Sequence, residues 1–191
     1  MTRDRDRLPP GQHLVSGWPV LHVGPIPRFD EEQWDFKVYG EVEHPVTFTY
    51  RQLKELPVER VTADFHCVTK FSVLDNQWEG VSFRTIIEMV APLPSATHVI
   101  AHCDISYTSN LSLEVMDDDD VMVVWARNGE PLSPEHGFPL RLMVPKRYAW
   151  KSAKWLRALE FAAKDRRGFW EDRGYNNNAD PWKEERYSYQ E

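Results

Sequence analysis

The chain has 191 residues, of which 41% are hydrophobic and 28% are charged, so it is long enough to bury a core and is not a disordered chain. Its 14 prolines argue against a helical bundle, because proline interrupts helices. Its net charge of −7 argues against nucleic acid or an anionic membrane surface as a partner.

The first residues do not have the pattern of a targeting segment. Met1 to Arg7 is charged and leads into Leu-Pro-Pro-Gly rather than into an apolar stretch. No apolar run approaches the length of a membrane span. We therefore expect a cytoplasmic protein without a membrane span. Its two cysteines, Cys67 and Cys103, are then expected to be reduced rather than joined in a structural disulfide.

Short strands dominate the expected secondary structure. Alternating apolar and polar residues, or short apolar runs between turn signals, predict strands at 34–39, 46–50, 61–67, 97–102, 121–125, 140–144 and 155–161. The stretch 68–76 is expected to be a loop, and Asn128-Gly129 a turn.

Only two helices are expected. One covers 50–56, with Thr49 as its cap and Pro57 as its stop, and the other begins after the cap Ser82 and continues to about Val90. Strands and helices in this order predict a mixed, mainly β, α+β fold rather than repeated βαβ units.

The expected organisation is a single domain at 17–163, preceded by an irregular segment at 1–16. Residues 164–191 form a polar tail that carries the rings of Phe169, Trp170, Tyr175 and Trp182. We expect this tail to lie along its own domain rather than against another subunit.

Cys67 is the first candidate for chemistry. It lies where the predicted strand 61–67 gives way to a loop that contains Lys70, and such loops place side chains at the mouths of pockets. A nearby cation favours the thiolate, and a soft thiolate suits a transition metal that is already held by other sulfurs. A buried free thiol is the alternative for this residue taken alone.

A zinc site is suggested by the two dipeptides His66-Cys67 and His102-Cys103. Neighbouring side chains on a strand point to opposite faces, so four ligands from two such dipeptides do not easily converge. The short Cys-x-x-Cys spacing of structural zinc sites is also missing. Zinc is therefore not the favoured metal.

A basic cluster near the C-terminus is out of character in an acidic chain. Its cations are Arg141, Lys146, Arg147, Lys151 and Lys154, and the rings of Tyr148, Trp150 and Trp155 stand between them. Such a cluster could hold a phosphate, together with the Ser152 hydroxyl and backbone amides, and the rings favour a lined pocket over solvated surface charge.

Other polar residues are weaker candidates. His136 lies just before the strand at 140–144 and could reach a pocket there, and His22 lies in a proline-rich loop. A structural, hydrogen-bonded role is the alternative for each of them. The run Asp117 to Asp120 is expected to be a solvated turn, because four consecutive carboxylates cannot all face one ion.

Two segments together resemble the sulfite oxidase-type molybdopterin-dependent oxidoreductases, in particular their short stand-alone bacterial members. The first is Asp64-Phe-His-Cys67-Val-Thr followed by Asp75-Asn-Gln-Trp-Glu-Gly-Val81. The second is Asn128-Gly-Glu-Pro-Leu-Ser-Pro-Glu-His-Gly-Phe-Pro-Leu-Arg141, then Val144-Pro and Lys151-Ser-Ala-Lys-Trp-Leu156. The resemblance covers about residues 17–163.

The resemblance implies an enzyme with one molybdopterin, in which the dithiolene sulfurs and Cys67 bind one molybdenum ion. It places Cys67 as the catalytic residue and implies cofactor contacts by His22, Cys103, Asp104, His136, Arg141, Ser152, Ala153 and Lys154. It also implies two-electron oxygen-atom transfer on a small-molecule substrate, with a separate protein as electron donor or acceptor.

The chain departs from sulfite oxidases after the cysteine, where Val68-Thr-Lys-Phe replaces an arginine-bearing segment that helps to bind sulfite. We therefore expect a substrate other than sulfite. Two alternatives remain open: a non-catalytic molybdopterin-binding or carrier protein, and a metal-free thiol enzyme that uses Cys67 with His66 as its base.

Overall fold

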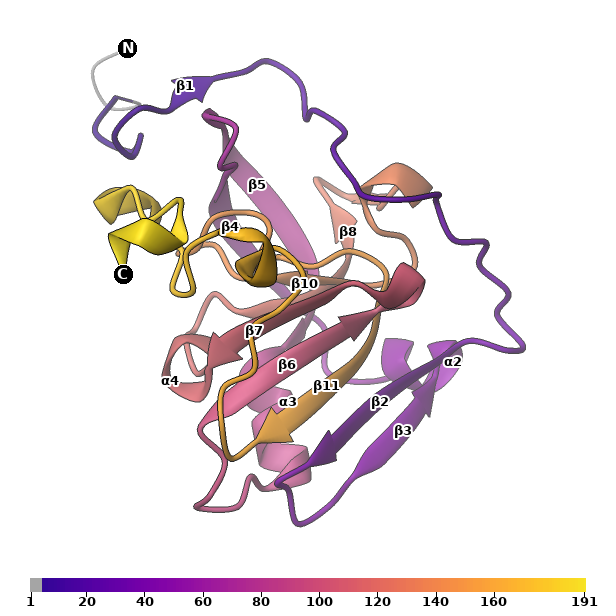
Figure 1. Cartoon of the computed structure of the whole chain (residues 1–191). Helices are drawn as coiled ribbons and strands as arrows, with labels where there is room; N and C mark the ends of the chain where they lie inside the picture. The colour runs from indigo at the N-terminus through magenta and orange to yellow at the C-terminus, as the bar shows by residue number, and fades with distance from the viewer. Residues whose placement is uncertain (1–4) are drawn as a thin grey trace.

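Two β-sheets and a few short helices build one domain, which is the mainly β, α+β fold that the sequence predicts. The computed structural model describes residues 5–191 (Figure 1). One sheet has five strands in the order β3-β2-β11-β6-β7, and the other has six strands, with the path β1-β5-β8-β10, β4 beside β5 and β9 beside β8. Strand β11 runs parallel to β2, and β1 parallel to β5, whereas the other pairs are antiparallel.

The strands of the five-stranded sheet are β2 (Asp35–Gly40), β3 (Val46–Thr49), β6 (His98–Cys103), β7 (Thr108–Ser112) and β11 (Leu156–Ala162). Those of the six-stranded sheet are β1 (His13–Leu14), β4 (Glu59–His66), β5 (Phe71–Ser82), β8 (Met122–Arg127), β9 (Glu130–Pro131) and β10 (Arg141–Met143). The α-helices are α2 (Tyr50–Lys54), α3 (Phe83–Val90) and α4 (Leu113–Met116). Short 3-10 turns are η1 (Asp104–Ser106), η2 (Pro134–His136), η3 (Glu171–Arg173), η4 (Pro181–Lys183) and η5 (Ser188–Gln190).

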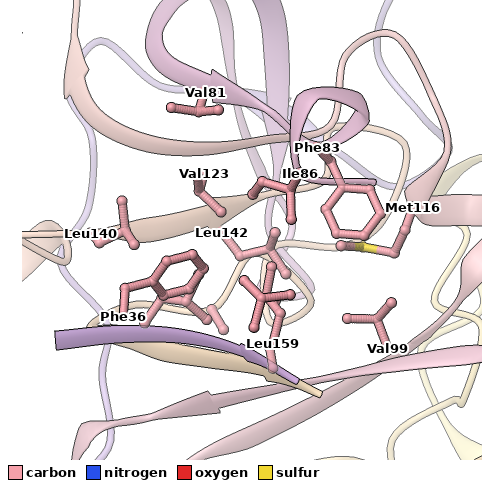
Figure 2. Close-up of a cluster of buried hydrophobic side chains, with 14 of the residues drawn as sticks. Phe36, Val81, Phe83, Ile86, Val99, Met116, Val123, Leu140, Leu142 and Leu159 are labelled. Atoms are coloured by element: carbon pink, nitrogen blue, oxygen red, sulfur yellow. The ribbon is translucent and has the colours of Figure 1, made fainter. Parts of the chain in front are cut away.

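The main core is formed where the two sheets and the helices α3 and α4 face one another (Figure 2). Strand β2 faces this core with every second residue. Phe36 and Val38 are fully buried, whereas Lys37 between them is exposed. Residues from both sheets and both helices meet in Figure 2: Phe36, Val81, Phe83, Ile86, Val99, Met116, Val123, Leu140, Leu142 and Leu159.

The two predicted helices are confirmed, and capping explains both. The Thr49 hydroxyl accepts a hydrogen bond from the Gln52 amide while the Gln52 side chain accepts one from the Thr49 amide, a capping box that starts α2. Ser82 caps α3, which ends at Ala91 in the left-handed conformation, with φ 49°. None of the helices within residues 5–191 is long and apolar enough to cross a membrane.

The prediction of a loop at 68–76 is wrong for most of its length. Strand β5 begins at Phe71, and only Val68 to Lys70 form a turn between β4 and β5. Phe71, Ser72 and Val73 are all buried, because β5 pairs with both β1 and β4 and the cavity described below lies against it. A strand that is buried on both faces shows no alternation, so its period was not visible in the sequence.

Four further strands and α-helices of the described chain were not predicted at all: β7, the short helix α4 that follows it, and the two-residue strands β1 and β9. Strand β7 has the polar sequence Thr-Ser-Asn-Leu-Ser, yet Ser109 and Asn110 are buried. The C-terminal tail covers them, since Phe169 donates its amide hydrogen to the Thr108 carbonyl and Gly168 donates to the Asn110 side chain. The tail thus lies beside β7, and Arg186 of the tail donates from Nη2 to the Pro10 carbonyl of the N-terminal segment at 3.4 Å.

Candidate active site

A cavity of about 350 Å³ lies between the β4–β5 turn, β10, the segment 149–155, the N-terminal segment and the tail. This volume is within the usual range of ligand pockets. Seven of the predicted site residues line it: His22, Cys67, His136, Arg141, Ser152, Ala153 and Lys154. The structure therefore brings together residues that are up to 132 positions apart (His22 to Lys154).

Cys67 lies at the tip of the β4–β5 hairpin and is 9% exposed. Its amide donates to the Phe71 carbonyl at 2.9 Å, and its own carbonyl accepts from the Lys70 amide at 3.0 Å, so the turn is closed on both sides. The Thr69 hydroxyl donates to Cys67 Sγ at 3.1 Å. This hydrogen bond helps to fix the position of the sulfur atom, and Cys67 lines the cavity.

Two other segments fix the hairpin tip, defined here as Cys67–Lys70. Gln12 in the N-terminal segment donates its side-chain amide to the Cys67 carbonyl at 3.0 Å. Arg186 in the tail donates from Nη1 to the Val68 carbonyl at 2.6 Å, and its guanidinium lies over the Tyr148 ring. The position of Cys67 therefore depends on both ends of the chain.

His66 does not share the cavity with Cys67. Its Nδ1 is 2.8 Å from the Ser72 hydroxyl, and its ring packs edge-on against Trp182. His102 pairs instead with Glu160 in the other sheet. No group of three or more His, Cys, Asp or Glu side chains that could hold a metal occurs in the described part of the chain. The alternation of side chains along a strand accounts for this separation.

Arg141 is the central cation of the cavity and is only 4% exposed. It donates from Nη1 to the His136 carbonyl at 2.9 Å, but its buried Nε has no hydrogen-bond partner among residues 5–191. No carboxylate of the described chain forms an ion pair with it. Burial lowers its pKa to about 9. A buried guanidinium without a counter-charge is costly unless an anion joins it.

Lys154 is the second cation of the cavity. Its ammonium donates to the carbonyls of Leu21 at 2.7 Å and Glu135 at 2.8 Å. Burial, and then the charge of Arg141, lowers the pKa of Lys154 to about 7. Gly137 permits this close packing, because it has φ 113° and a Cβ there would lie 3.2 Å from the Lys154 side chain.

The two predicted histidines are held by neighbouring carbonyls. His136 Nε2 is 3.2 Å from the Trp18 carbonyl, so it donates there, and its ring stacks on the Trp18 ring with centroids 3.9 Å apart. Burial and then Arg141 lower the pKa of His136, which keeps it neutral. His22 donates from Nδ1 to the Gly24 carbonyl at 3.0 Å, and this leaves its Nε2 as an acceptor.

The segment Ser152–Lys154 is anchored against β10. The Ser152 hydroxyl accepts from the Val144 amide at 2.9 Å, and the Ala153 carbonyl accepts from the Leu142 amide at 2.9 Å. These bonds fix the direction in which Ser152, Ala153 and Lys154 meet the cavity.

Cys103 and Asp104 do not line the cavity within the described chain. Cys103 is buried in the main core, and burial raises the pKa of its thiol. Asp104 pairs with Arg157 at 3.2 Å and borders a different depression. Both cysteines are free.

Only some residues of the predicted basic cluster line the cavity in the described chain. Lys146 pairs with Asp118 at 2.6 Å on the surface. The acidic run Asp117 to Asp120 forms a turn whose side chains are exposed or half-buried, as predicted. Lys151 is fully buried and pairs with the fully buried Glu171 at 2.6 Å. Arg141 and Lys154 alone among the Lys and Arg residues of the described chain line the cavity.

Two aromatic residues of the cavity, Trp170 and Tyr175 of the tail, were not predicted to line a pocket, whereas Trp150 is among the rings for which a lined pocket is predicted. Trp150, Trp170 and Tyr175, called here the aromatic wall, line the cavity together with Cys67. Tyr175 meets Trp150 edge-on at 5.1 Å and Trp170 at 5.0 Å. Burial, and then the charges of Tyr187 and Cys67, raise the pKa of Tyr175. The high tryptophan content and the ring-rich tail were the available signals, but neither showed where the rings lie.

The donor set of the cavity fits a phosphate-bearing, sulfur-ligated metal cofactor. Cys67 offers a soft ligand, and Arg141 offers an uncompensated buried charge with a free Nε–H group. Lys154 adds a second cation in the same cavity. Within the part of the chain that the structure describes, neither cation has the carboxylate partner that buried charges need, and a phosphate would supply the missing negative charge.

Comparison with known proteins identifies the family. The family described as "Oxidoreductase molybdopterin binding domain" matches residues 23–170, well over half of the chain. The chain belongs to this family. The resemblance to the sulfite oxidase-type molybdopterin enzymes is thereby confirmed, and molybdopterin is the cofactor of the domain.

Two relatives and one solved structure are similar to the chain to different extents. The "uncharacterized oxidoreductase YuiH" of Bacillus subtilis is 41% identical over 192 residues, which cover 98% of this chain and 97% of that protein. The catalytic subunit MsrP of the protein-methionine-sulfoxide reductase of Campylobacter jejuni is 25% identical over 81% of this chain and 59% of its own length. The sulfane dehydrogenase SoxCD of Paracoccus pantotrophus has the same fold, with a TM-score of 0.67 and 24% identity over 73% of this chain and 40% of that chain.

Proposed function

We propose that Cys67 is the protein ligand of a molybdenum ion held by molybdopterin, in an enzyme that transfers an oxygen atom between water and a small molecule. The observation that carries this proposal is the shared cavity of Cys67 and Arg141, in which a potential thiolate ligand faces a buried cation without a carboxylate partner. When bound, the cofactor supplies the metal at which an oxide, two protons and two electrons are converted to the reduced substrate and water, or the reverse.

The residues around Cys67 would position the cofactor. Arg141 and Lys154 would hold its phosphate, with Ser152 and Ala153 on the same segment. His22 and His136 would contact it through their rings, whose orientation is set by carbonyls. The cavity lining does not support the predicted roles of Cys103 and Asp104, which rest on the sequence resemblance alone.

We also propose that residues 17–163 form the cofactor-holding domain, between an irregular segment at 1–16 and a tail at 164–191. The family match at 23–170 supports the position of the central part. A separate protein would exchange electrons with it, a proposal supported by the printed name of MsrP as a catalytic subunit. Sulfite is not favoured as substrate, because Lys70 is exposed and does not line the cavity.

Two other functions are less well supported. A metal-free thiol enzyme would need a base beside Cys67, but His66 points toward Ser72 and Trp182. A non-catalytic carrier would keep the cavity and lack turnover. Reduction of a panel of oxides by a reduced viologen dye separates enzyme from carrier, since only an enzyme oxidises the dye in a substrate-dependent way.

The proposal is tested by the molybdenum and pterin content of protein made in a host that synthesises the cofactor. We expect the unmodified chain to contain both groups. We expect Arg141→Met to lower cofactor affinity about tenfold or more, because a hydrogen bond to a charged group contributes about 1.5–3 kcal/mol. Arg166→Met removes an exposed guanidinium that pairs with Glu160 and should have no effect. Unmodified protein that lacks molybdenum would contradict the proposal.

A further inference from the structure

The aromatic wall and the two cations approach the cavity from different elements. Arg141 and Lys154 come from β10 and the segment after it, and they contact the N-terminal segment through Leu21 and the η2 turn through His136. The aromatic wall instead packs with Val68 of the hairpin tip, next to Cys67. The cavity therefore has a cationic part and an apolar part, and Cys67 lines both.

The rings of the aromatic wall are held in place before any ligand binds. Trp150 donates from Nε1 to the buried carboxylate of Glu171 at 2.8 Å, and its carbonyl accepts from the Tyr107 hydroxyl at 2.7 Å. The Trp150 ring also stacks on Tyr148, with centroids 5.5 Å apart. A pre-ordered apolar surface binds an apolar group with little loss of side-chain freedom.

Within residues 5–191, the lining residues that contact the aromatic wall carry no charge. They are Val68, which packs with its rings, and Tyr107, whose hydroxyl donates to the Trp150 carbonyl. Within the part of the chain that the structure describes, the cationic residues of the lining are those assigned above to the cofactor phosphate. If the cofactor phosphate occupies Arg141 and Lys154, an inorganic oxyanion that binds against the aromatic wall would lose its water without gaining a partner of opposite charge.

We propose that the aromatic wall is the substrate subsite of this enzyme, and that it takes an uncharged organic molecule with an apolar substituent next to the reacting atom. This inference rests on the function proposed above. The apolar substituent would lie against Trp170 and Tyr175, while the polar oxide faces the side of the cavity that Cys67 lines. Substrate selection would then depend on Trp170 and Tyr175 of the tail as well as on the part of the fold that holds the cofactor.

Binding to the full chain loaded with its cofactor tests the proposal, with tryptophan fluorescence as the readout. The probes are methyl p-tolyl sulfoxide, which is uncharged and carries a ring, dimethyl sulfoxide, which has only methyl groups, and sulfite, which is an anion without an apolar group. We expect the aryl sulfoxide to bind most tightly. Trp170→Leu and Tyr175→Leu should each weaken its binding about tenfold, because a ring contact and its buried apolar area are lost. Tyr189→Leu is the matched control, since Tyr189 is a tail ring that is 81% exposed.

Two outcomes would overturn the inference while the proposed function stands. In one, molybdenum and pterin are present but sulfite binds more tightly than the aryl sulfoxide, or the two wall variants bind the sulfoxide as well as the control does. In the other, the wall variants lose pterin in proportion to their loss of binding, which would make the wall part of the cofactor site. Unmodified protein without molybdenum or pterin would instead contradict the proposed function itself.

Discussion

At the scale of single residues, the molecule buries or half-buries three cations, Arg141, Lys151 and Lys154, and compensates their charges differently. Lys151 has a carboxylate partner, Glu171, and both side chains are fully buried. Arg141 is almost as buried and has no such partner among the described residues. Lys154 donates to the backbone carbonyls of Leu21 and Glu135 and lies over the Trp155 ring, and it forms no ion pair among residues 5–191. The paired lysine therefore has a structural role, and the arginine without a carboxylate partner among residues 5–191 supports the proposed phosphate site.

The buried pair Lys151–Glu171 leads to a stability prediction. We expect Lys151→Met to lower the free energy of unfolding by about 3–5 kcal/mol, because it leaves Glu171 buried without its cation. The double variant Lys151→Met with Glu171→Leu should recover much of this loss. Urea unfolding of the three proteins measures both effects. Equal stability of the single and double variants would show that the lone carboxylate is not the cause.

At the scale of elements, the β4–β5 hairpin presents Cys67 and depends on segments far away in sequence. Arg186 donates to the Val68 carbonyl from the tail, and Gln12 donates to the Cys67 carbonyl from the N-terminal segment. Neither residue lies within the family match at 23–170. The hairpin places the cysteine at a turn, and the two ends of the chain keep that turn closed.

We expect Arg186→Met to loosen the hairpin tip. Removing a hydrogen bond from a charged donor costs about 1.5–3 kcal/mol, so local opening should become about tenfold more frequent or more. The rate at which iodoacetamide alkylates Cys67 in cofactor-free protein reports this opening. Arg51→Met, on the exposed side of α2, is the control and should leave the rate unchanged. An unchanged rate in Arg186→Met would show that the tail does not restrain Cys67.

The sequence predicts elements well where the signal is local. The alternation in β2 and the caps Thr49 and Ser82 depend on neighbours a few residues away, and the structure has those elements at nearly the predicted positions. The start of β5 and the polar strand β7 depend on what covers them from other parts of the chain. The residues of these two strands do not alternate between apolar and polar in a way that would reveal which segments bury them.

At the scale of the whole molecule, the cavity is assembled from segments that span nearly the entire chain. Trp18 and His22 come from the N-terminal segment, Cys67 from the β4–β5 hairpin, and Trp170 and Tyr175 from the tail. Local motifs and the resemblance to a family indicated the cysteine and the cationic residues. The tail residues of the aromatic wall, Trp170 and Tyr175, could not be predicted to line the cavity, because they reach it only once the tail has folded back over β7 and the hairpin tip.

The two cations give the cofactor-free protein a characteristic pH dependence. Burial and Arg141 lower the pKa of Lys154 to about 7, whereas its ordinary value in the unfolded chain is 10.5. Between these pH values the unfolded state binds more protons than the folded state, so the free energy of unfolding rises with pH. We expect this rise in urea unfolding of cofactor-free protein between about pH 7 and pH 9, and a smaller rise in Lys154→Met.

Inorganic phosphate extends this measurement. A bound anion favours the charged ammonium and raises the pKa of Lys154, so saturating phosphate should flatten the dependence of stability on pH. If unmodified protein and Lys154→Met show the same slope with and without phosphate, Lys154 does not titrate in this range.

The ligation of the metal by Cys67 is tested most directly by X-ray absorption at the molybdenum edge, which counts sulfur neighbours of the metal. Cys67→Ser and Cys103→Ser each remove one buried thiol, and only Cys67 lines the cavity within the described chain. We expect protein loaded in the same host to lose one sulfur neighbour in Cys67→Ser and none in Cys103→Ser. An unchanged sulfur count in Cys67→Ser would contradict the assignment of Cys67 as the molybdenum ligand.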